Sequence, residues 1–353
     1  MNNTRKTKSL LIEHCRAYPK AQLQDIFKYI YQSAYGCEHM ITSLEAVTER
    51  IKKEYESSPR NHQPVVSLDS DFCRVPLSVL DTGISPETLG RLFFLSAKKE
   101  VGKTDALLEK LKASRELIAE KKLPFGLEDF DMALSKWEGT GFQSISHSEA
   151  FRNEYSPSYR VIAKEYVPYL PLFAELDRRL RKSDVRLALE GGSAVGKTTL
   201  ASTLSSIYDC NVFHMDDFFL QPHQRTPERF AEAGGNVDRE RFIAEVLEPL
   251  NNGKTVRYRK FDCSEMKLGD YTEVEKKRLT VIEGAYSMHP EMADSYDLSV
   301  LLTVPEDIQR ERIKKRNTPE MAKRFFNEWI PMEEKYFSEL GIKEKCGMVI
   351  CTE

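Results

Sequence analysis

Residues 191–198 read Gly-Gly-Ser-Ala-Val-Gly-Lys-Thr and match the pattern G-x-x-x-x-G-K-[ST] in full. Glycines let such a backbone curl so that its N–H groups point at phosphate oxygens, and the following helix N-terminus adds partial positive charge. We expect Lys197 to reach the β- and γ-phosphates of a nucleotide, Thr198 to hold Mg²⁺ and Thr199 to bond another phosphate oxygen. The predicted nucleotide-binding loop consists of Gly191, Gly192, Ser193, Ala194, Val195, Gly196, Lys197, Thr198 and Thr199.

Two carboxylates follow the next apolar segment, in the sequence His-Met-Asp-Asp-Phe-Phe at residues 214–219. A carboxylate at the C-terminal edge of a strand beside the loop would face the γ-phosphate. It could accept a proton from an attacking hydroxyl or orient the waters of Mg²⁺. Taken alone, Asp216 fits this role and a loop-capping role equally well.

The loop, the segment 214–219 and the segment Val-Ile-Glu-Gly at 281–284 together resemble the uridine kinase and phosphoribulokinase-like superfamily of P-loop small-molecule kinases. The resemblance covers residues 184–353, about half of the chain. It implies that Asp216 is the catalytic base and a Mg²⁺-site residue, with Asp217 as its substrate-binding neighbour. It also implies that Glu283 lies near Mg²⁺ and the acceptor.

The same resemblance implies further substrate and lid residues. Asp238 aligns with an aspartate that bonds ribose hydroxyls, although a simple helix N-cap explains it equally well. Tyr258 and Phe261 lie in a segment resembling the aromatic acceptor region, but the residues after Asp262 depart from the family pattern. Arg312 and Arg316 are four residues apart, hence on one helix face, and match the lid arginines that neutralise phosphate charge. A solvated charged helix is the alternative for this pair.

Two kinds of pattern divide the chain. After about residue 184, short apolar strands alternate with helices, which predicts an α/β domain with a parallel sheet covered on both faces. Before residue 165, apolar residues at spacings of three and four predict a mainly α-helical domain. We expect a helical domain at 1–165, a connector at 166–183 and a P-loop kinase domain at 184–353, with residues 159–182 helical.

The helical half resembles no family that its residues identify. Two dense polar clusters occur there, at residues 36–39 and at His147-Ser148-Glu149 with the nearby Arg152, Tyr155, Tyr159 and Arg160. They could recognise a ligand or the other half of the chain. Packing between domains and ordinary surface are the more common explanations for such clusters.

Composition excludes several classes of protein. The 353 residues contain 52 Lys+Arg and 55 Asp+Glu, a net charge of −3 that offers no support for nucleic-acid binding. No apolar run approaches the 18 residues of a membrane span, and the polar N-terminus does not suggest a secretory signal. Seven cysteines without a CxxC pair are typical of a reducing cytoplasm.

The sequence therefore predicts a cytoplasmic phosphotransferase that uses ATP as co-substrate, Mg²⁺ as cofactor and an alcohol group as acceptor. A nucleoside-like metabolite is the leading acceptor. The alternatives are a kinase of a pantothenate- or glycerate-like acid and a regulatory protein whose nucleotide half switches the helical half. The identity of the acceptor and the presence of a homo-oligomer stay open.

Overall fold

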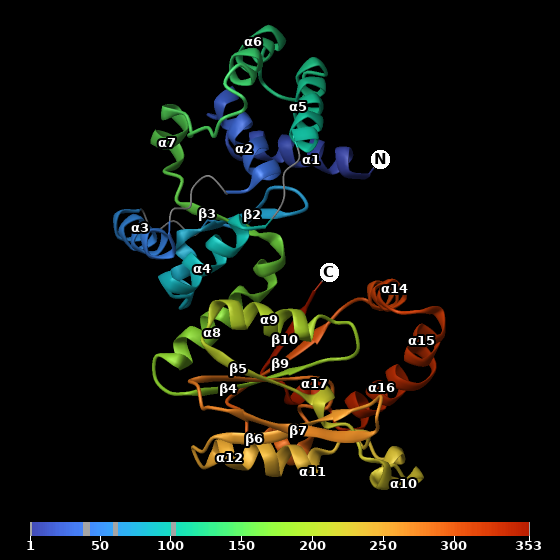
Figure 1. Cartoon of the computed structure of the whole chain (residues 1–353). Coiled ribbons are helices and arrows are strands. Elements are labelled where there is room, and N and C mark those ends of the chain that lie inside the picture. The colour runs from blue at the N-terminus through green and yellow to red at the C-terminus, as the bar shows by residue number, and fades with distance from the viewer. Residues whose placement is uncertain (1, 38–42, 59–62, 100–103, 353) are drawn as a thin grey trace. The chain divides into compact units, whose positions relative to one another are not determined.

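In a computed structural model, the chain forms two compact units, residues 1–177 and 178–353 (Figure 1). The structure describes residues 2–37, 43–58, 63–99 and 104–352, so Glu38 and His39 of the first polar cluster lie outside the described residues. Within the described residues, no helix is long and apolar enough to cross a membrane.

The N-terminal unit surrounds a small antiparallel sheet with helices. Its strands run in the order β1-β2-β3, with bounds Val66–Ser67, Phe72–Pro76 and Tyr159–Ala163. The helices are α1 Asn2–Ala17, α2 Leu23–Tyr35, α3 Leu44–Ser57, α4 Pro86–Ala97, α5 Thr104–Ala119, α6 Leu127–Glu138, α7 Glu149–Tyr155 and α8 Leu170–Leu180, the last ending in the second unit. The unit is mainly helical, as the apolar periodicity predicts.

The expectation of helix across residues 159–182 is wrong for its first part. Residues 159–163 form strand β3, which pairs with β2 from Phe72↔Ala163 to Pro76↔Tyr159. Four of its five residues are buried, and its consecutive apolar residues suit a buried strand. The pairing partner lies far away in the sequence, so local periodicity gives no sign of it. A 3₁₀ segment at Lys164–Tyr169 and then α8 follow.

The C-terminal unit is an α/β domain with a five-stranded parallel sheet in the order β10-β9-β4-β8-β5. The central strands β4 and β8 are buried at all but one residue and are mostly apolar, because both faces of the sheet are covered. The strands are β4 Val185–Glu190, β5 Cys210–His214, β8 Leu279–Glu283, β9 Leu298–Thr303 and β10 Met348–Cys351. This is the α/β P-loop fold that the alternation of strands and helices predicts.

Helices and a β-ribbon pack around this sheet. Helix α9, Lys197–Ile207, follows the glycine-rich loop and packs on β4, β5 and β8. The core below the sheet draws on residues 238–251, which run as α11 Arg239–Phe242, a π-helical segment and α12 Glu248–Asn251. Further elements are α10 Pro227–Ala231, α13 Pro290–Ala293, α14 Glu306–Arg316, α15 Pro319–Arg324, α16 Ile330–Glu339 and α17 Ile342–Lys345.

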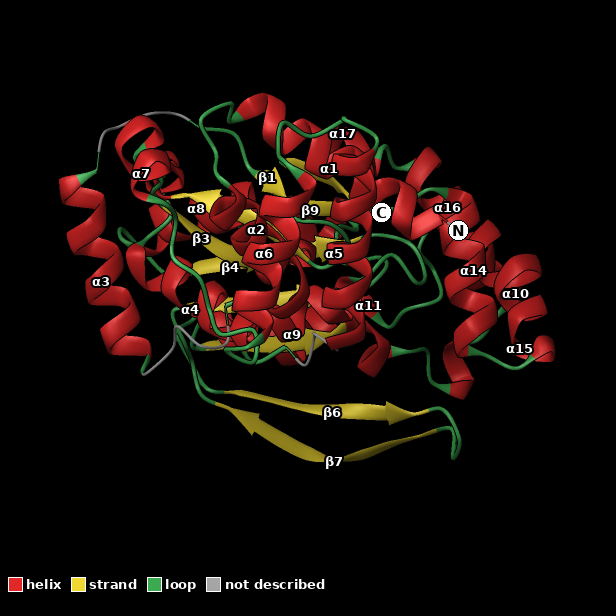
Figure 2. Cartoon of the chain, turned by 90° about the horizontal axis from the view of Figure 1, so that it is seen from above, coloured by secondary structure: helices red, strands yellow, loops and turns green. Residues whose placement is uncertain are grey.

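The strand that follows α12 does not join the parallel sheet. It is β6, Val256–Asp262, which pairs antiparallel with β7, Lys267–Val274, in a separate two-stranded ribbon (Figure 2). All but two residues of β7 are exposed, so it has no apolar pattern by which sequence reasoning could find it. The inward side of β6 contributes Val256 and Tyr258 to the core.

Candidate active site

The glycine-rich loop joins the end of β4 to the start of α9. Gly191 has φ of 149°, and a Cβ there would lie 2.6 Å from the carbonyl oxygen of Leu302 on β9, so only glycine fits. Gly196 has φ of 106° and caps α9. Lys197 Nζ donates to the Gly192 carbonyl over 2.9 Å and so bridges the loop. The side chains of Thr198 and Thr199 are exposed, which leaves the phosphate-binding end of the loop open to solvent.

Strand register brings a second set of polar residues to the same edge of the sheet. His214 at the end of β5 pairs with Glu283 at the end of β8, and Glu283 pairs in turn with Leu189 of β4. Because the carboxyl ends of parallel strands meet at one edge, Glu283 lies beside the first residues of α9. Thr198 Oγ1 donates to Glu283 Oε1 over 3.0 Å, and His214 Nδ1 lies 2.6 Å from the same oxygen.

The electrostatics of this edge favour an ionised Glu283. Burial opposes ionisation, but the bond to His214, the charge of Lys197 and the bond from Thr198 outweigh it and hold the pKa of the Glu283 carboxyl below its usual value. The hydrogen bond with Glu283 in turn raises the pKa of His214. A hydroxyl beside an ionised carboxylate is the hard oxygen donor set that Mg²⁺ prefers.

Asp216 lies in the turn that follows β5, at Met215–Phe218. Its side chain keeps contact with solvent, yet the protein walls around it remove enough water to raise the pKa of its carboxyl, against the opposing charge of Lys197. Glu283 and Asp217 add like charge that acts in the same direction. The neighbouring Asp217 pairs instead with Lys260 of β6, at 2.9 Å. The two adjacent carboxylates therefore have different surroundings, and Asp216 is the one influenced by Lys197.

The glycine that follows Glu283, Gly284, is required by its backbone conformation and by a close neighbour. Its φ is 147°, and a Cβ would lie 2.5 Å from the Cβ of Met215 in the turn after β5. Glycine therefore allows the two strand ends that carry Asp216 and Glu283 to approach each other.

The remaining predicted substrate residues are engaged in the fold. Asp238 is buried and caps α11, since its Oδ1 accepts from the Arg241 N–H over 3.1 Å and its Oδ2 lies 3.2 Å from Arg241 Nε. Tyr258 is buried and stacks on Phe218 with ring centres 5.6 Å apart. Phe261 is also buried. Asp238 thus caps a helix and both aromatic side chains are buried, and the substrate-binding roles of all three stay predictions.

The two predicted lid arginines differ in their surroundings. Arg312 on α14 donates from Nη1 to the Ala194 carbonyl of the loop over 3.3 Å. Arg316, the last residue of the same helix, is exposed. The structure therefore brings Arg312 to the nucleotide-binding loop, while Arg316 makes no hydrogen bond or ion pair with the described residues.

Three residues that sequence reasoning did not single out also contact the site. Gln309 on α14 donates to the Ser193 carbonyl over 2.8 Å. Glu333 on α16 accepts from the Ser193 N–H over 2.9 Å and from its hydroxyl over 2.7 Å. His214 immediately precedes the acidic turn at Met215–Phe218, so its place in that motif could have marked it as a site residue. Gln309 and Glu333 lie in ordinary charged helices, and only the tertiary fold brings them to the loop.

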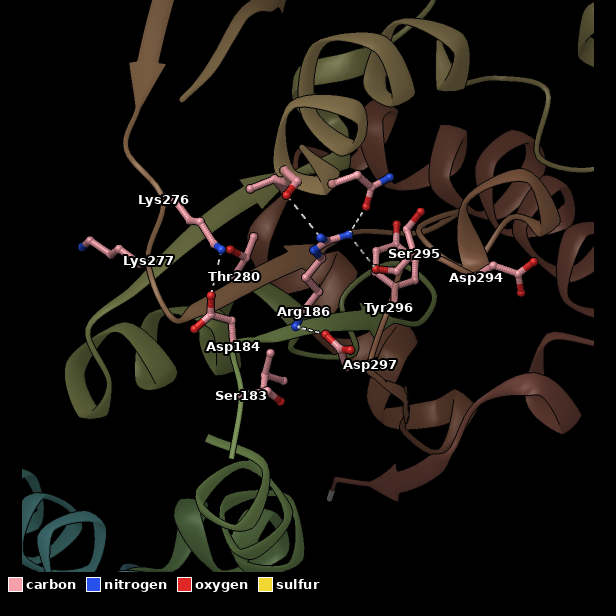
Figure 3. A pocket seen from close by; sticks show the side chains of 13 residues that line it. Ser183, Asp184, Arg186, Lys276, Lys277, Thr280, Asp294, Ser295, Tyr296 and Asp297 are labelled. Atoms are coloured by element: carbon pink, nitrogen blue, oxygen red, sulfur yellow. Dashed lines mark hydrogen bonds and ion pairs between the residues drawn. The ribbon is translucent and has the colours of Figure 1, made fainter. Parts of the chain in front are cut away.

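A separate pocket lies at the ends of the parallel strands opposite to the nucleotide-binding loop. It has a volume of about 520 Å³ and is lined by residues at the beginnings of β4 and β8, among them Arg186 and Thr280 (Figure 3). Its polar groups bond to one another: the Arg186 N–H donates to Asp297 over 2.7 Å, and Lys276 pairs with Asp184 at 2.9 Å. This pocket is separate from the loop, which follows the end of β4.

Known structures similar to the chain include P-loop kinases. A possible uridine kinase from Bacillus stearothermophilus is 20% identical, with a TM-score of 0.38, and the match covers 50% of this chain and 99% of that one. A shikimate kinase from Bacteroides thetaiotaomicron is 16% identical, with a TM-score of 0.23, over 47% of this chain and 85% of that one. No family model matches the sequence. The fold assignment rests on the strand order and the loop described above.

Proposed function

We propose that the chain is an ATP-dependent kinase that transfers the γ-phosphoryl group to a hydroxyl of a small metabolite, with a nucleoside-like compound as the leading acceptor. The observation that carries the proposal is the position of Asp216. It lies at the strand edge that also presents Lys197, Thr198 and Glu283, and the charge of Lys197 acts on its carboxyl. A protein that only binds nucleotide has no need of a second, solvent-accessible carboxylate there.

In the proposed reaction, an acceptor oxygen forms a bond to the γ-phosphorus of ATP while the bond from that phosphorus to the β–γ bridging oxygen breaks. ADP leaves, and the proton of the acceptor hydroxyl passes to Asp216 and then to solvent. Lys197 and the loop N–H groups stabilise the charge on the phosphates. Arg312, held at the loop through Ala194, is placed to add positive charge.

Mg²⁺ fits this site because Thr198 and Glu283 are within hydrogen-bonding distance of each other and Asp216 lies on the neighbouring strand end. When bound with ATP, the ion would neutralise charge on the β- and γ-phosphates. His214 keeps Glu283 ionised and oriented toward Thr198. In this proposal the base comes from the turn after β5, and the oxygen donors come from Glu283 at the end of β8 and Thr198 in the first turn of α9.

An acceptor screen tests this proposal. The full chain with ATP and Mg²⁺ is assayed for ADP release in the presence of nucleosides, vitamins and sugar acids. We expect acceptor-dependent release with at least one class, led by nucleosides, and its loss in Lys197→Ala, because the main phosphate-binding cation is gone. ATP binding without acceptor-dependent release across the panel, or unchanged turnover in Lys197→Ala, would contradict the proposal.

A further inference from the structure

The N-terminal unit contains a buried arginine without a counter-ion. Arg74 projects from the middle of β2 and is 4% exposed. The described chain has three other buried arginines, and each forms an ion pair: Arg160 with Glu54, Arg239 with Glu291, and Arg241 with Asp238. Within the described residues, Arg74 has no such carboxylate. Burying an unpaired charge is costly, so a fold retains it only where something compensates.

The immediate neighbours of Arg74 compensate only in part. Its Nε donates to Gln32 Oε1 over 2.9 Å, and its guanidinium carbon lies 5.4 Å and 4.8 Å from the ring centres of Tyr29 and Tyr159. Nη2 is buried without a hydrogen-bond partner in the described part of the chain, as is one nitrogen each of Arg160 and Arg239, whose charges are paired. An aromatic face attracts a cation, but it does not accept the two parallel N–H hydrogen bonds that a carboxylate accepts from a guanidinium. One donor therefore has no partner, and no carboxylate of the described residues contacts the positive charge.

No nearby titratable group among the described residues forms an ion pair with Arg74. Asp25 is ionised, since burial opposes ionisation but its hydrogen bonds outweigh burial and lower the pKa of its carboxyl to about 2, and it acts on Arg74 only through space. Its oxygens accept from Gln22 N–H at 2.9 Å and from Ser148 at 3.0 Å and 2.6 Å, and one lies 2.9 Å from His147 Nδ1. His14 is buried with both ring nitrogens unpartnered. Burial, followed by the charge of Arg74, lowers the pKa of His14 to about 2, so this ring stays neutral.

A small pocket adjoins this arginine. It measures about 20 Å³ and is lined by Arg74 together with Tyr18, Gln63, Phe151, Tyr155 and Tyr159. That volume holds one or two water-sized groups rather than a whole metabolite. The pocket therefore suits the polar end of a ligand, with the remainder lying on the aromatic side chains around the opening.

We propose that the Arg74 pocket binds the carboxylate group of a small organic acid that has an aromatic or otherwise apolar body. A single guanidinium balances one negative charge, and its planar fork matches a carboxylate. A phosphate would bring a second charge, and the described residues that line the pocket include no second cation to offset it. The partly exposed rings of Tyr18, Tyr155 and Tyr159 supply the surface for the apolar body, whereas Phe151 is buried behind them. This site belongs to the N-terminal unit alone and does not depend on the proposed kinase activity.

The test is calorimetric titration of the full chain with sodium benzoate and phenylacetate at constant ionic strength. Benzamide, a neutral molecule of nearly the same shape as benzoate, and inorganic phosphate serve as comparisons. We expect one benzoate or phenylacetate per chain and at least about tenfold weaker binding of benzamide and phosphate, because a charge-assisted bond is lost or a second charge is buried. Equal binding of benzoate and benzamide, or no binding of either acid, would overturn the proposal.

Two variants locate the site. Arg74→Met should abolish acid binding while keeping or raising the thermal unfolding midpoint, because it removes an unpaired buried charge. The matched control Arg160→Met should lower the midpoint and keep acid binding, because it removes the buried one of the two arginines that pair with Glu54 and leaves only Arg50. Should Arg74→Met fail to fold, Arg74→Lys keeps the charge without the fork, and we expect weaker benzoate binding there. Wild-type binding in a folded Arg74 variant would overturn the assignment.

Discussion

Replacing Asp216 by asparagine separates a kinase from a nucleotide switch. The substitution keeps the size of the side chain and removes its charge. None of the hydrogen bonds in the described chain uses the Asp216 carboxylate, so the change should not disturb the fold. Protein walls around Asp216 raise the pKa of its carboxyl, which makes it a better proton acceptor than an ordinary aspartate once it is ionised.

The expected loss follows from this role. A positioned carboxylate base contributes about 10²–10⁴-fold to the rate, which corresponds to about 2.7–5.4 kcal/mol of activation free energy. ATP affinity should change little, because Lys197 and the loop backbone, rather than Asp216, provide the phosphate contacts. Since the base must be ionised and its pKa is raised, wild-type kcat/KM should fall on acidification at a higher pH than an unperturbed aspartate would give.

The assay measures kcat against Mg²⁺ concentration, with ATP affinity titrated on the same variant. Restoration by excess Mg²⁺ would move Asp216 from base to metal ligand. Asp217→Asn is the matched control, because Asp217 pairs with Lys260 and should affect turnover less. Wild-type kcat in Asp216→Asn would refute the reasoning and make Asp217 or Glu283 the next candidate.

Three further predictions concern stability and are measured by urea unfolding. Tyr336→Phe removes the donor 2.9 Å from the fully buried Glu190 and should lower the free energy of unfolding by about 1–3 kcal/mol; no loss would mean that the other donors suffice. Gly284→Ala should cost about 1–3 kcal/mol, through its φ of 147° and the approach to Met215, and an unchanged midpoint would contradict this. Burial lowers the pKa of His147 to about 4, so between pH 6.5 and pH 4 the unfolded state binds more protons than the folded state, and the free energy of unfolding should fall on acidification. His147→Gln should flatten this part of the dependence of stability on pH. A wild-type slope in the variant would exclude His147 as its source.

Those parts of the C-terminal unit that are determined by local sequence patterns could be predicted from the sequence. The glycine-rich loop, the strands around it and the position of Glu283 follow from short motifs and from the rule that parallel strand ends share an edge. The roles assigned to these residues remain predictions. The contact of Glu283 with His214 depends on strand register, which a sequence does not display.

What sequence reasoning missed depends on contacts between distant residues. Strand β3 forms because residues 159–163 pair with residues 72–76, and β7 forms because β6 offers it an edge. Glu333 approaches Ser193 from 140 positions away in the chain. Arg74 shows the same limit, since neither its burial nor its missing counter-ion is visible in the residues beside it.

The order of strands in the parallel sheet has a consequence for synthesis on the ribosome. Strand β4, which leads into the nucleotide loop, pairs with β8 and β9, and these begin only at Leu279 and Leu298. The loop therefore lacks both of its flanking strands until most of the second unit has emerged. By contrast, every strand of the N-terminal sheet is complete by Ala163. We expect the first unit to become protease-resistant on stalled nascent chains well before the second, whose exposed apolar strand β4 is the segment that needs protection from aggregation during that interval.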